Sequence, residues 1–191
     1  NILEAVKGVR VGSNKTAAAS MDSSPEVKSK IEGAVKNFKV VDTKYYSHGG
    51  VDVIVQVPLS GIMDTLVPSA GAKVAAAKDV ADGTTGVIVN AAGLKVTPAL
   101  APKVLSDAGA EVYSAEMVSK EASQASGVLT YVKTLDQAMK DSKVAGKPLV
   151  IKALKLADSG SADVVISATD AAKVAALGSV LSQGKVVFVI D

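Results

Sequence analysis

The sequence lacks several residue types on which common protein chemistries depend. Its 191 residues include no cysteine and no tryptophan, and the only histidine is His48. Without cysteine there are no disulfides, no thiolate catalysis, no cysteine-ligated zinc and no iron–sulfur cluster. A single imidazole also excludes a histidine-rich metal site within one chain. We therefore expect no metal ion and no cofactor.

Charge and hydrophobic runs exclude two further classes. The chain has 21 basic and 19 acidic residues, and Arg10 is its one arginine. A net charge of +2 does not provide the concentrated basic face that nucleic acid requires. No apolar run approaches the roughly 18 residues of a membrane-spanning helix. We expect neither nucleic-acid binding nor a spanning helix.

What the sequence does have is a supply of small and branched apolar residues, which alternate between two kinds of segment. Apolar residues make up 48% of the chain and aromatic residues 3%. Segments rich in β-branched residues alternate with alanine-rich helical stretches, a pattern typical of an α+β protein. We predict two small domains: an N-terminal helix-on-antiparallel-sheet module over residues 1–67 and a mixed α/β domain over 85–191. Residues 68–84 are predicted to be a linker or a helix.

The N-terminal module is predicted to hold a helix followed by a hairpin. After an opening amphipathic helix and a strand over Val9–Val11, Ser24-Pro25-Glu26 marks a helix start, and the helix should end near Asn37. Strands over Phe38–Tyr46 and Val51–Leu59 are joined around His48-Gly49-Gly50, a β-hairpin signal.

Valines alternate along the second strand of this predicted hairpin and share one face of it, namely Val51, Val53, Val55 and Val57. We expect this face to pack on the preceding helix, so that Val55→Asp would disrupt the N-terminal fold. Of the adjacent Tyr45 and Tyr46, we expect one to enter the core and the other to be a surface anchor.

The second half is predicted to alternate strands and helices, ending in a strand that is apolar on both faces and therefore central. A helix should follow the capping-box spacing of Thr134 to Gln137, and another should be capped by Thr169 and stop at Gly184. No internal repeat is visible. The predicted strands lie at 86–90, 111–114, 127–133, 149–156, 163–167 and 185–190, and residues 91–102 are predicted to be irregular.

Motifs for catalysis are absent or wrongly spaced, so we expect no catalytic and no cofactor-binding residue. Gly178 and Gly184-Lys185 are one residue too far apart for a phosphate-binding loop, and Val186 replaces the required Ser or Thr. No serine lies in a G-x-S-x-G elbow. His48 lies in a glycine turn, which favours an exposed turn residue over a rigidly oriented base.

The acidic residues show no metal-binding spacing. Asp158, Asp163 and Asp170 surround a Gly-Ser segment, and Asp79 and Asp82 lie close together in the linker. None has the alternating spacing of a calcium loop, so helix caps and solvated turns explain them better. Too many acidic pairs exist to choose one for a hydrolase. The glycosylation sequon that begins at Asn14 is short enough to arise by chance.

A resemblance enters over the first third of the chain. The run LEAVKGVRV, followed by SSPEVKSKIEGAVKNFKVVDTKYYSHGGVDVIVQVPLSG, resembles the LPP-twenty bacterial lipoprotein family and related modules in FlgP and the N-terminal domain of FlgT. The second half, from GVIVNAAGLKV to GKVVFVID, looks like the C-terminal extension of longer members. The matching positions are Gly8, Val9, Val11, Ile31, Gly33, Val40, Val41, Tyr45, Gly50, Val53, Val55, Val57, Pro58, Leu59 and Gly61.

This resemblance implies an exported protein of the periplasm or outer membrane. It also implies a lipid anchor on a cysteine upstream of Asn1, although no signal peptide is visible in the chain. The family supplies no catalytic residues. A structural role in an outer-membrane or flagellar assembly follows from it as an expectation.

The resulting functional hypothesis is a non-enzymatic envelope lipoprotein that acts through protein–protein contacts. Its partners would include a second copy of the chain, with an exposed sheet edge available for self-association. The alternative is a periplasmic binding module for a small molecule or cell-wall polymer, with its site between the two domains. A hydrolase ranks below both.

Overall fold

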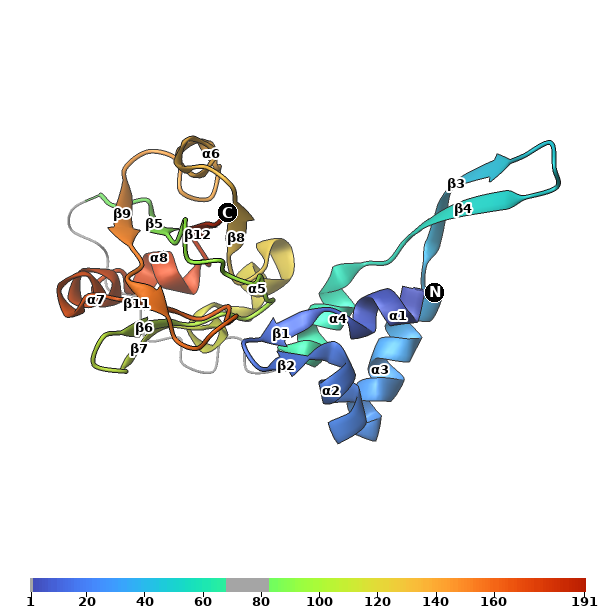
Figure 1. Cartoon of the computed structure of the whole chain (residues 1–191), viewed down its shortest axis with the longest axis horizontal. Helices are drawn as coiled ribbons and strands as arrows, with labels where there is room; N and C mark the ends of the chain where they lie inside the picture. The colour runs from blue at the N-terminus through green and yellow to red at the C-terminus, as the bar shows by residue number, and fades with distance from the viewer. Residues whose placement is uncertain (1, 68–82) are drawn as a thin grey trace.

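A computed structural model describes residues 2–67 and 83–191 and shows an α+β protein, which confirms the predicted fold class (Figure 1). The segment predicted to be a linker or helix, 68–84, lies outside the described residues except for positions 83 and 84. Within the described ranges, no helix has both the length and the apolar character needed to cross a membrane.

The N-terminal part is a cluster of short helices around a small core. It contains α1 (Ile2–Lys7), β1 (Arg10–Gly12), β2 (Lys15–Thr16), α2 (Ala17–Ser23), α3 (Pro25–Lys36) and α4 (Leu59–Leu66). The predicted start of α3 is confirmed, because the Ser24 hydroxyl accepts a hydrogen bond from the backbone N–H of Val27 at 3.4 Å. Its apolar stripe buries Ile31 completely, beside Met21 and Ile62. Sequence reasoning missed α2 and α4.

The predicted hairpin forms, but its position is not the predicted one. Strands β3 (Lys39–Tyr45) and β4 (Val51–Gln56) pair antiparallel and extend away from the helices as an arm (Figure 1). The expected packing of the valine face is wrong for Val51 and Val53, which are half exposed, whereas Val57, beyond the end of β4, does pack against the core. The second strand also ends earlier than predicted, because the chain turns at Pro58 and Leu59 begins α4.

The C-terminal part is built on two four-stranded sheets. The first is entirely parallel, in the order β8 (Thr130–Val132), β12 (Val186–Val189), β5 (Gly86–Asn90) and β9 (Pro148–Lys152). The second is mixed, in the order β10 (Lys155–Leu156), β11 (Val164–Ile166), β6 (Val104–Ser106) and β7 (Glu111–Tyr113). The predicted central position of the last strand is confirmed, because β12 lies between β8 and β5 and is buried throughout.

The two sheets contain a structural repeat that the sequence does not show. Three parallel pairs, β5 with β9, β6 with β11 and β8 with β12, join segments separated by similar lengths of chain. The first unit of the repeat runs from β5 to β8 and the second from β9 to β12. A helical segment precedes the last strand of each unit: α5 (Lys120–Ser126) in the first, and α7 (Ala168–Ala175) with α8 (Gly178–Ser182) in the second. The expectation of no internal repeat is therefore corrected at the level of the architecture.

The helix predicted from the capping-box spacing is present as α6 (Leu135–Lys140). The Thr134 hydroxyl accepts a hydrogen bond from the N–H of Gln137 at 3.2 Å, and the Gln137 side chain accepts one from the N–H of Lys133 at 3.1 Å. These bonds satisfy backbone donors at the start of the helix, which is why the local spacing predicted it.

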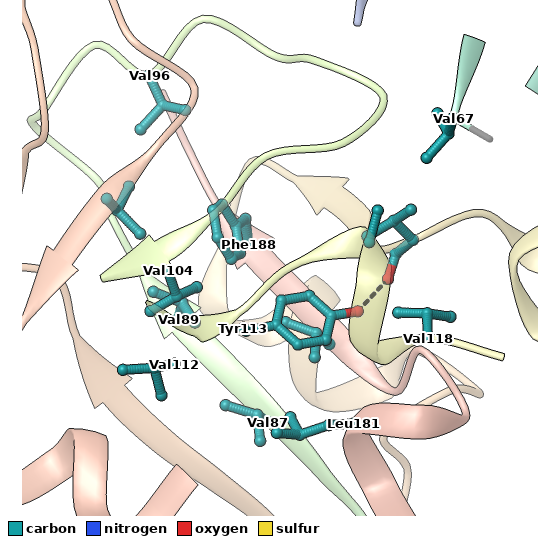
Figure 2. Packing of buried hydrophobic residues seen from close by; sticks show 14 of the residues in the cluster. Val67, Val87, Val89, Val96, Val104, Val112, Tyr113, Val118, Leu181 and Phe188 are labelled. Atoms are coloured by element: carbon teal, nitrogen blue, oxygen red, sulfur yellow. Dashed lines mark hydrogen bonds between the residues drawn. The ribbon is translucent and has the colours of Figure 1, made fainter. Parts of the chain in front are cut away.

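The core of this part consists mainly of valine, with two large rings. Figure 2 shows Phe188 and Tyr113 among the buried side chains of Val89, Val118 and Leu181. Tyr113 donates a hydrogen bond to the Val128 carbonyl, so its one polar atom is satisfied, and burial raises the pKa of its phenol far above the usual range. Phe188 meets Tyr131 edge to face, with ring centroids 5.8 Å apart.

Several predicted boundaries in this part need correction. The strand predicted over 149–156 is divided into β9 and β10, which belong to different sheets. The last helix is capped by Ser167 rather than Thr169, because β11 ends at Ile166 and the Ser167 hydroxyl accepts from the N–H of Asp170 at 3.1 Å. That helix is also divided into α7 and α8, with the buried Leu177 between them. Sequence reasoning missed β6, α5 and the 3₁₀ turn η1 (Ala115–Met117).

The two parts of the chain are joined through β1. The carbonyls of Arg10 and Val11 accept hydrogen bonds from the N–H groups of Leu100 and Ala101, at 2.9 and 2.8 Å. The Ser13 hydroxyl accepts from the N–H of Asp163 at 3.1 Å. One apolar cluster contains buried residues of both parts. The segment 91–102 has no helix or strand, as predicted, because its backbone follows these inter-part contacts rather than a ladder.

Candidate functional site

The arm formed by β3 and β4 has at its tip a tight turn that the sequence specifies. The N–H of Gly49 donates to the carbonyl of Tyr46, and the N–H of Tyr46 donates to the carbonyl of Gly50, both at 2.9 Å. Gly49 has φ +85°, a conformation that glycine adopts at little cost. A Cβ on Gly50 would lie 2.7 Å from Nε2 of the exposed His48 side chain, which can move, so Gly49 is the glycine that the turn requires.

The pairing register gives the arm one apolar face and one polar face. Val40 pairs with Val55, Thr43 with Val53 and Tyr45 with Val51, and side chains of paired residues lie on the same side of a sheet. We call these six residues the apolar face of the arm. The opposite side, the polar face, carries Lys39, Asp42, Lys44, Asp52, Ile54 and Gln56.

The apolar face of the arm is open to solvent. Tyr45 is 79% exposed, Val40 57% and Val53 51%. Solvent-exposed apolar side chains that adjoin one another mark interaction surfaces more often than isolated ones do. Among the described residues, the arm is therefore the clearest candidate for a surface that contacts another molecule.

The polar residues near the tip are engaged within the hairpin. The Tyr46 hydroxyl donates to Oδ2 of Asp52 at 2.7 Å, and this hydrogen bond raises the pKa of the Tyr46 phenol. The ring of Tyr46 stacks on His48 with centroids 5.4 Å apart. The expectation that one tyrosine enters the core is wrong, since Tyr45 and Tyr46 are both exposed. His48 is an exposed turn residue, as predicted.

Asp163 and Asp170, assigned from the sequence to caps and solvated turns rather than to a metal site, each accept hydrogen bonds within the protein. Asp163 accepts the N–H of Lys103 at 2.7 Å, and Asp170 accepts from Ser167 and Lys173 at the start of α7. Lys173 and Ser167 lower the pKa of the Asp170 carboxyl through these hydrogen bonds, with the Lys173 bond as the larger cause. Across the part of the chain that the structure describes, no three acidic or histidine side chains could hold a metal ion. Asp79 and Asp82 lie outside the described residues.

A cavity of about 350 Å³ lies where the two parts meet, as the binding-module alternative requires. Its walls come from Met63 of α4 and from residues between Ala99 and Tyr131. The Tyr131 hydroxyl already donates to the carbonyl of Ala99 at 3.0 Å and accepts from its N–H at 3.1 Å. The donor of the Tyr131 hydroxyl is therefore already used within the protein, and the other polar side chains that line the cavity are those of Ser123, Gln124 and Ser126.

The described chain is thus an α+β protein that carries an exposed hairpin arm. Residues 86–191, more than half of the chain, match the family model of the second domain of Treponema pallidum Tp0624, and the chain belongs to that family. No curated protein matches it.

This match overturns the resemblance to the LPP-twenty family. The second half, interpreted as an extension of LPP-twenty proteins, matches a different family from its first strand to its last residue. The positions that carried the resemblance in the first half are mostly valines and glycines, and they lie in helices, strands and turns alike. Residues of these types recur in many unrelated strands and turns, so they specify a family weakly.

Proposed function

We propose that this protein acts through protein–protein contacts made by the apolar face of the arm. The observation that carries the proposal is the exposure of Val40, Tyr45 and Val53 on one face of a two-stranded sheet. An isolated two-stranded hairpin is at best marginally stable in water, and covering its apolar face or extending its sheet stabilises it. A protein partner that binds the arm supplies either of these.

The composition of the arm favours a protein partner over a membrane or nucleic acid. Its polar face carries Lys39 and Lys44 against Asp42 and Asp52, so the charges balance. An anionic membrane or a nucleic acid would require an excess of cations. Valine, tyrosine and threonine are instead the residues that pair well across strands.

The proposal assigns no reaction to the chain. The envelope location, the lipid anchor and the flagellar assembly were implied by the LPP-twenty resemblance, and they stay predictions. A contact made by the arm depends on none of them.

Photo-crosslinking in cells that make the protein tests the proposal. A photoreactive phenylalanine analogue at Tyr45 probes the apolar face, and the same analogue at Lys44, the adjacent residue on the polar face, is the matched control. We expect a discrete covalent adduct from position 45 that is absent from position 44 and is lost when Val53→Lys is added. Equal labelling from both positions, or none from position 45, would contradict the proposal.

A further inference from the structure

The two outer edges of the arm differ in how well they are protected. On β3, the register shifts between Val40 and Asp42, which marks a bulge. The N–H of Thr43 is bound by Oδ1 of Asp42 at 2.8 Å, so a side chain already occupies this edge. Bulges, edge charges and occupied donors all discourage strand addition. β4 has a single charge, Asp52, and no proline.

The turn determines which backbone groups of β4 face outward. Tyr46 and Gly50 form a hydrogen-bonded pair, and in an antiparallel ladder such pairs alternate with pairs whose N–H and C=O groups face away. Following the pairing register along the strand from this pair, Asp52 and Ile54 direct their backbone groups toward β3. Val51, Val53 and Val55 therefore direct theirs to the outer edge.

We propose that the outer edge of β4 pairs antiparallel with β4 of a second copy of this chain, about a two-fold axis at Val53. This inference rests on the proposed function and names its partner. Val53 then lies opposite Val53 of the other copy, and Val51 lies opposite Val55. All three outward-facing residues exchange backbone hydrogen bonds, and the two arms form one four-stranded sheet.

Charge pattern selects this register over its neighbours. In the proposed register Asp52 lies opposite Ile54, so the one charge of each strand avoids its own copy. A shift toward the turn places Asp52 opposite Asp52, a directly opposed like-charge pair. A shift either way also leaves one outward-facing valine of each strand unpaired. The strand is therefore self-complementary in one register, as an isologous interface requires.

Proline substitutions at the two edges provide a matched test. Val53→Pro removes an outward N–H from the open edge, and Thr43→Pro removes an outward N–H from the protected edge directly across the hairpin. By light scattering, we expect the wild-type chain and Thr43→Pro to reach twice the 19.2 kDa of one chain as concentration rises. Val53→Pro should stay at 19.2 kDa over the same range.

A cysteine at the two-fold axis tests the register itself. The chain has no cysteine, so Val53→Cys introduces its only thiol. The Cα atoms of two residues in a hydrogen-bonded antiparallel pair lie about 5.5 Å apart, which is within the range of a disulfide. With oxidised glutathione we expect a covalent dimer from Val53→Cys and none from Thr43→Cys.

The outcomes separate this inference from the function on which it rests. A wild-type chain that stays monomeric at all concentrations, with no disulfide from Val53→Cys, overturns the pairing. If position 45 still crosslinks to a protein of another mass, the proposed function stands without a second copy. If position 45 gives no adduct, the proposed function fails, whereas the pairing of β4 with a second copy is judged by the dimer mass and the disulfide from Val53→Cys, because Tyr45 lies on β3. Equal loss of the dimer in Val53→Pro and Thr43→Pro would also overturn the assignment to β4.

Discussion

Two valine-rich segments of this chain have opposite environments. β4 reads VDVIVQ and is largely exposed, whereas β12 reads VVFV and is buried throughout. Both form strands, and both are rich in β-branched residues. The difference lies in their neighbours: β12 has a strand on each side and α6 packed on it, whereas β4 pairs only with β3.

Strand propensity and burial are therefore separate properties. An alternating valine pattern specifies that a segment pairs and which side chains share a face. It does not specify whether anything covers that face. In β12 the cover comes from the same chain, and in β4 the proposed cover comes from a second molecule.

The largest effect is expected from placing a charge in the buried strand. Val187 is fully buried on β12, beside Ile88 and Ala138. Val187→Asp leaves an unpaired carboxylate there, at a cost of roughly 3–5 kcal/mol, a large fraction of the usual stability of a domain. We expect a much lower urea midpoint, measured by circular dichroism because the chain has no tryptophan. An unchanged midpoint would contradict the central position of β12.

The next effect is a loss of stability at alkaline pH through Tyr131. Burial is the main cause that raises the pKa of this phenol to about 12, whereas an unfolded tyrosine titrates near 10. The folded state therefore holds the proton longer. Its contribution is present below pH 10 and is lost as pH rises toward 12, by about 2–3 kcal/mol in total.

The measurement is the free energy of unfolding at pH 9 and pH 11.5 for wild type and Tyr131→Phe. We expect the variant to lose less stability between the two values. Tyr45→Phe is the control on the exposed arm and should differ from wild type by under about 0.5 kcal/mol at either pH. Parallel losses in wild type and Tyr131→Phe would show that Tyr131 does not contribute.

A smaller effect is expected where β5 packs against the segment before β9. A methyl group on Gly86 would collide with Cγ1 of Val144 and lie 2.8 Å from its Cα. Gly86→Ala should therefore cost about 1–3 kcal/mol through overpacking. The control substitution should change stability in the opposite direction. Gly33 in α3 has open space around it, so Gly33→Ala should stabilise the protein by about 0.4–1 kcal/mol. Destabilisation of equal size by both would contradict this account.

The smallest effect on stability is expected on the arm, where the same kind of charge is introduced as at Val187. Val53→Asp places it on a half-exposed side chain and should change stability by under about 0.5 kcal/mol. Val55→Asp, expected from sequence to disrupt the N-terminal fold, should also have a small effect. Melting temperatures within about 2 °C of wild type would agree. Unfolding of the N-terminal part in Val55→Asp would instead support the prediction that the valine face packs on α3.

The sequence was most informative where a signal is local. The cap at Ser24, the glycine turn after Tyr46 and the buried run of β12 each depend on a few consecutive residues, and the structure contains all three. It was least informative about tertiary position. Nothing within residues 149–156 indicates that the strand divides between two sheets, because that division depends on β5 and β11, which pair with its two halves.

The candidate site shows the same division. The residues of the arm, their alternation and their turn were predicted correctly. Their exposure was not, because a stripe of valine on one face looks the same whether α3 or solvent lies beside it. The asymmetry of the two edges depends partly on charges that the sequence shows, three on β3 against one on β4. It also depends on the hydrogen bond from Thr43 to Asp42 and on a bulge, and the sequence indicates neither.

The contact of β1 with residues 100 and 101 has a consequence for hydrogen exchange. The amides of Leu100 and Ala101 are held by carbonyls of Arg10 and Val11 across the junction of the two parts. If the parts separate while each stays folded, these two amides lose their acceptors, while those of β5 and β12 keep theirs. Their exchange rates therefore measure undocking of the parts directly, apart from unfolding of either sheet.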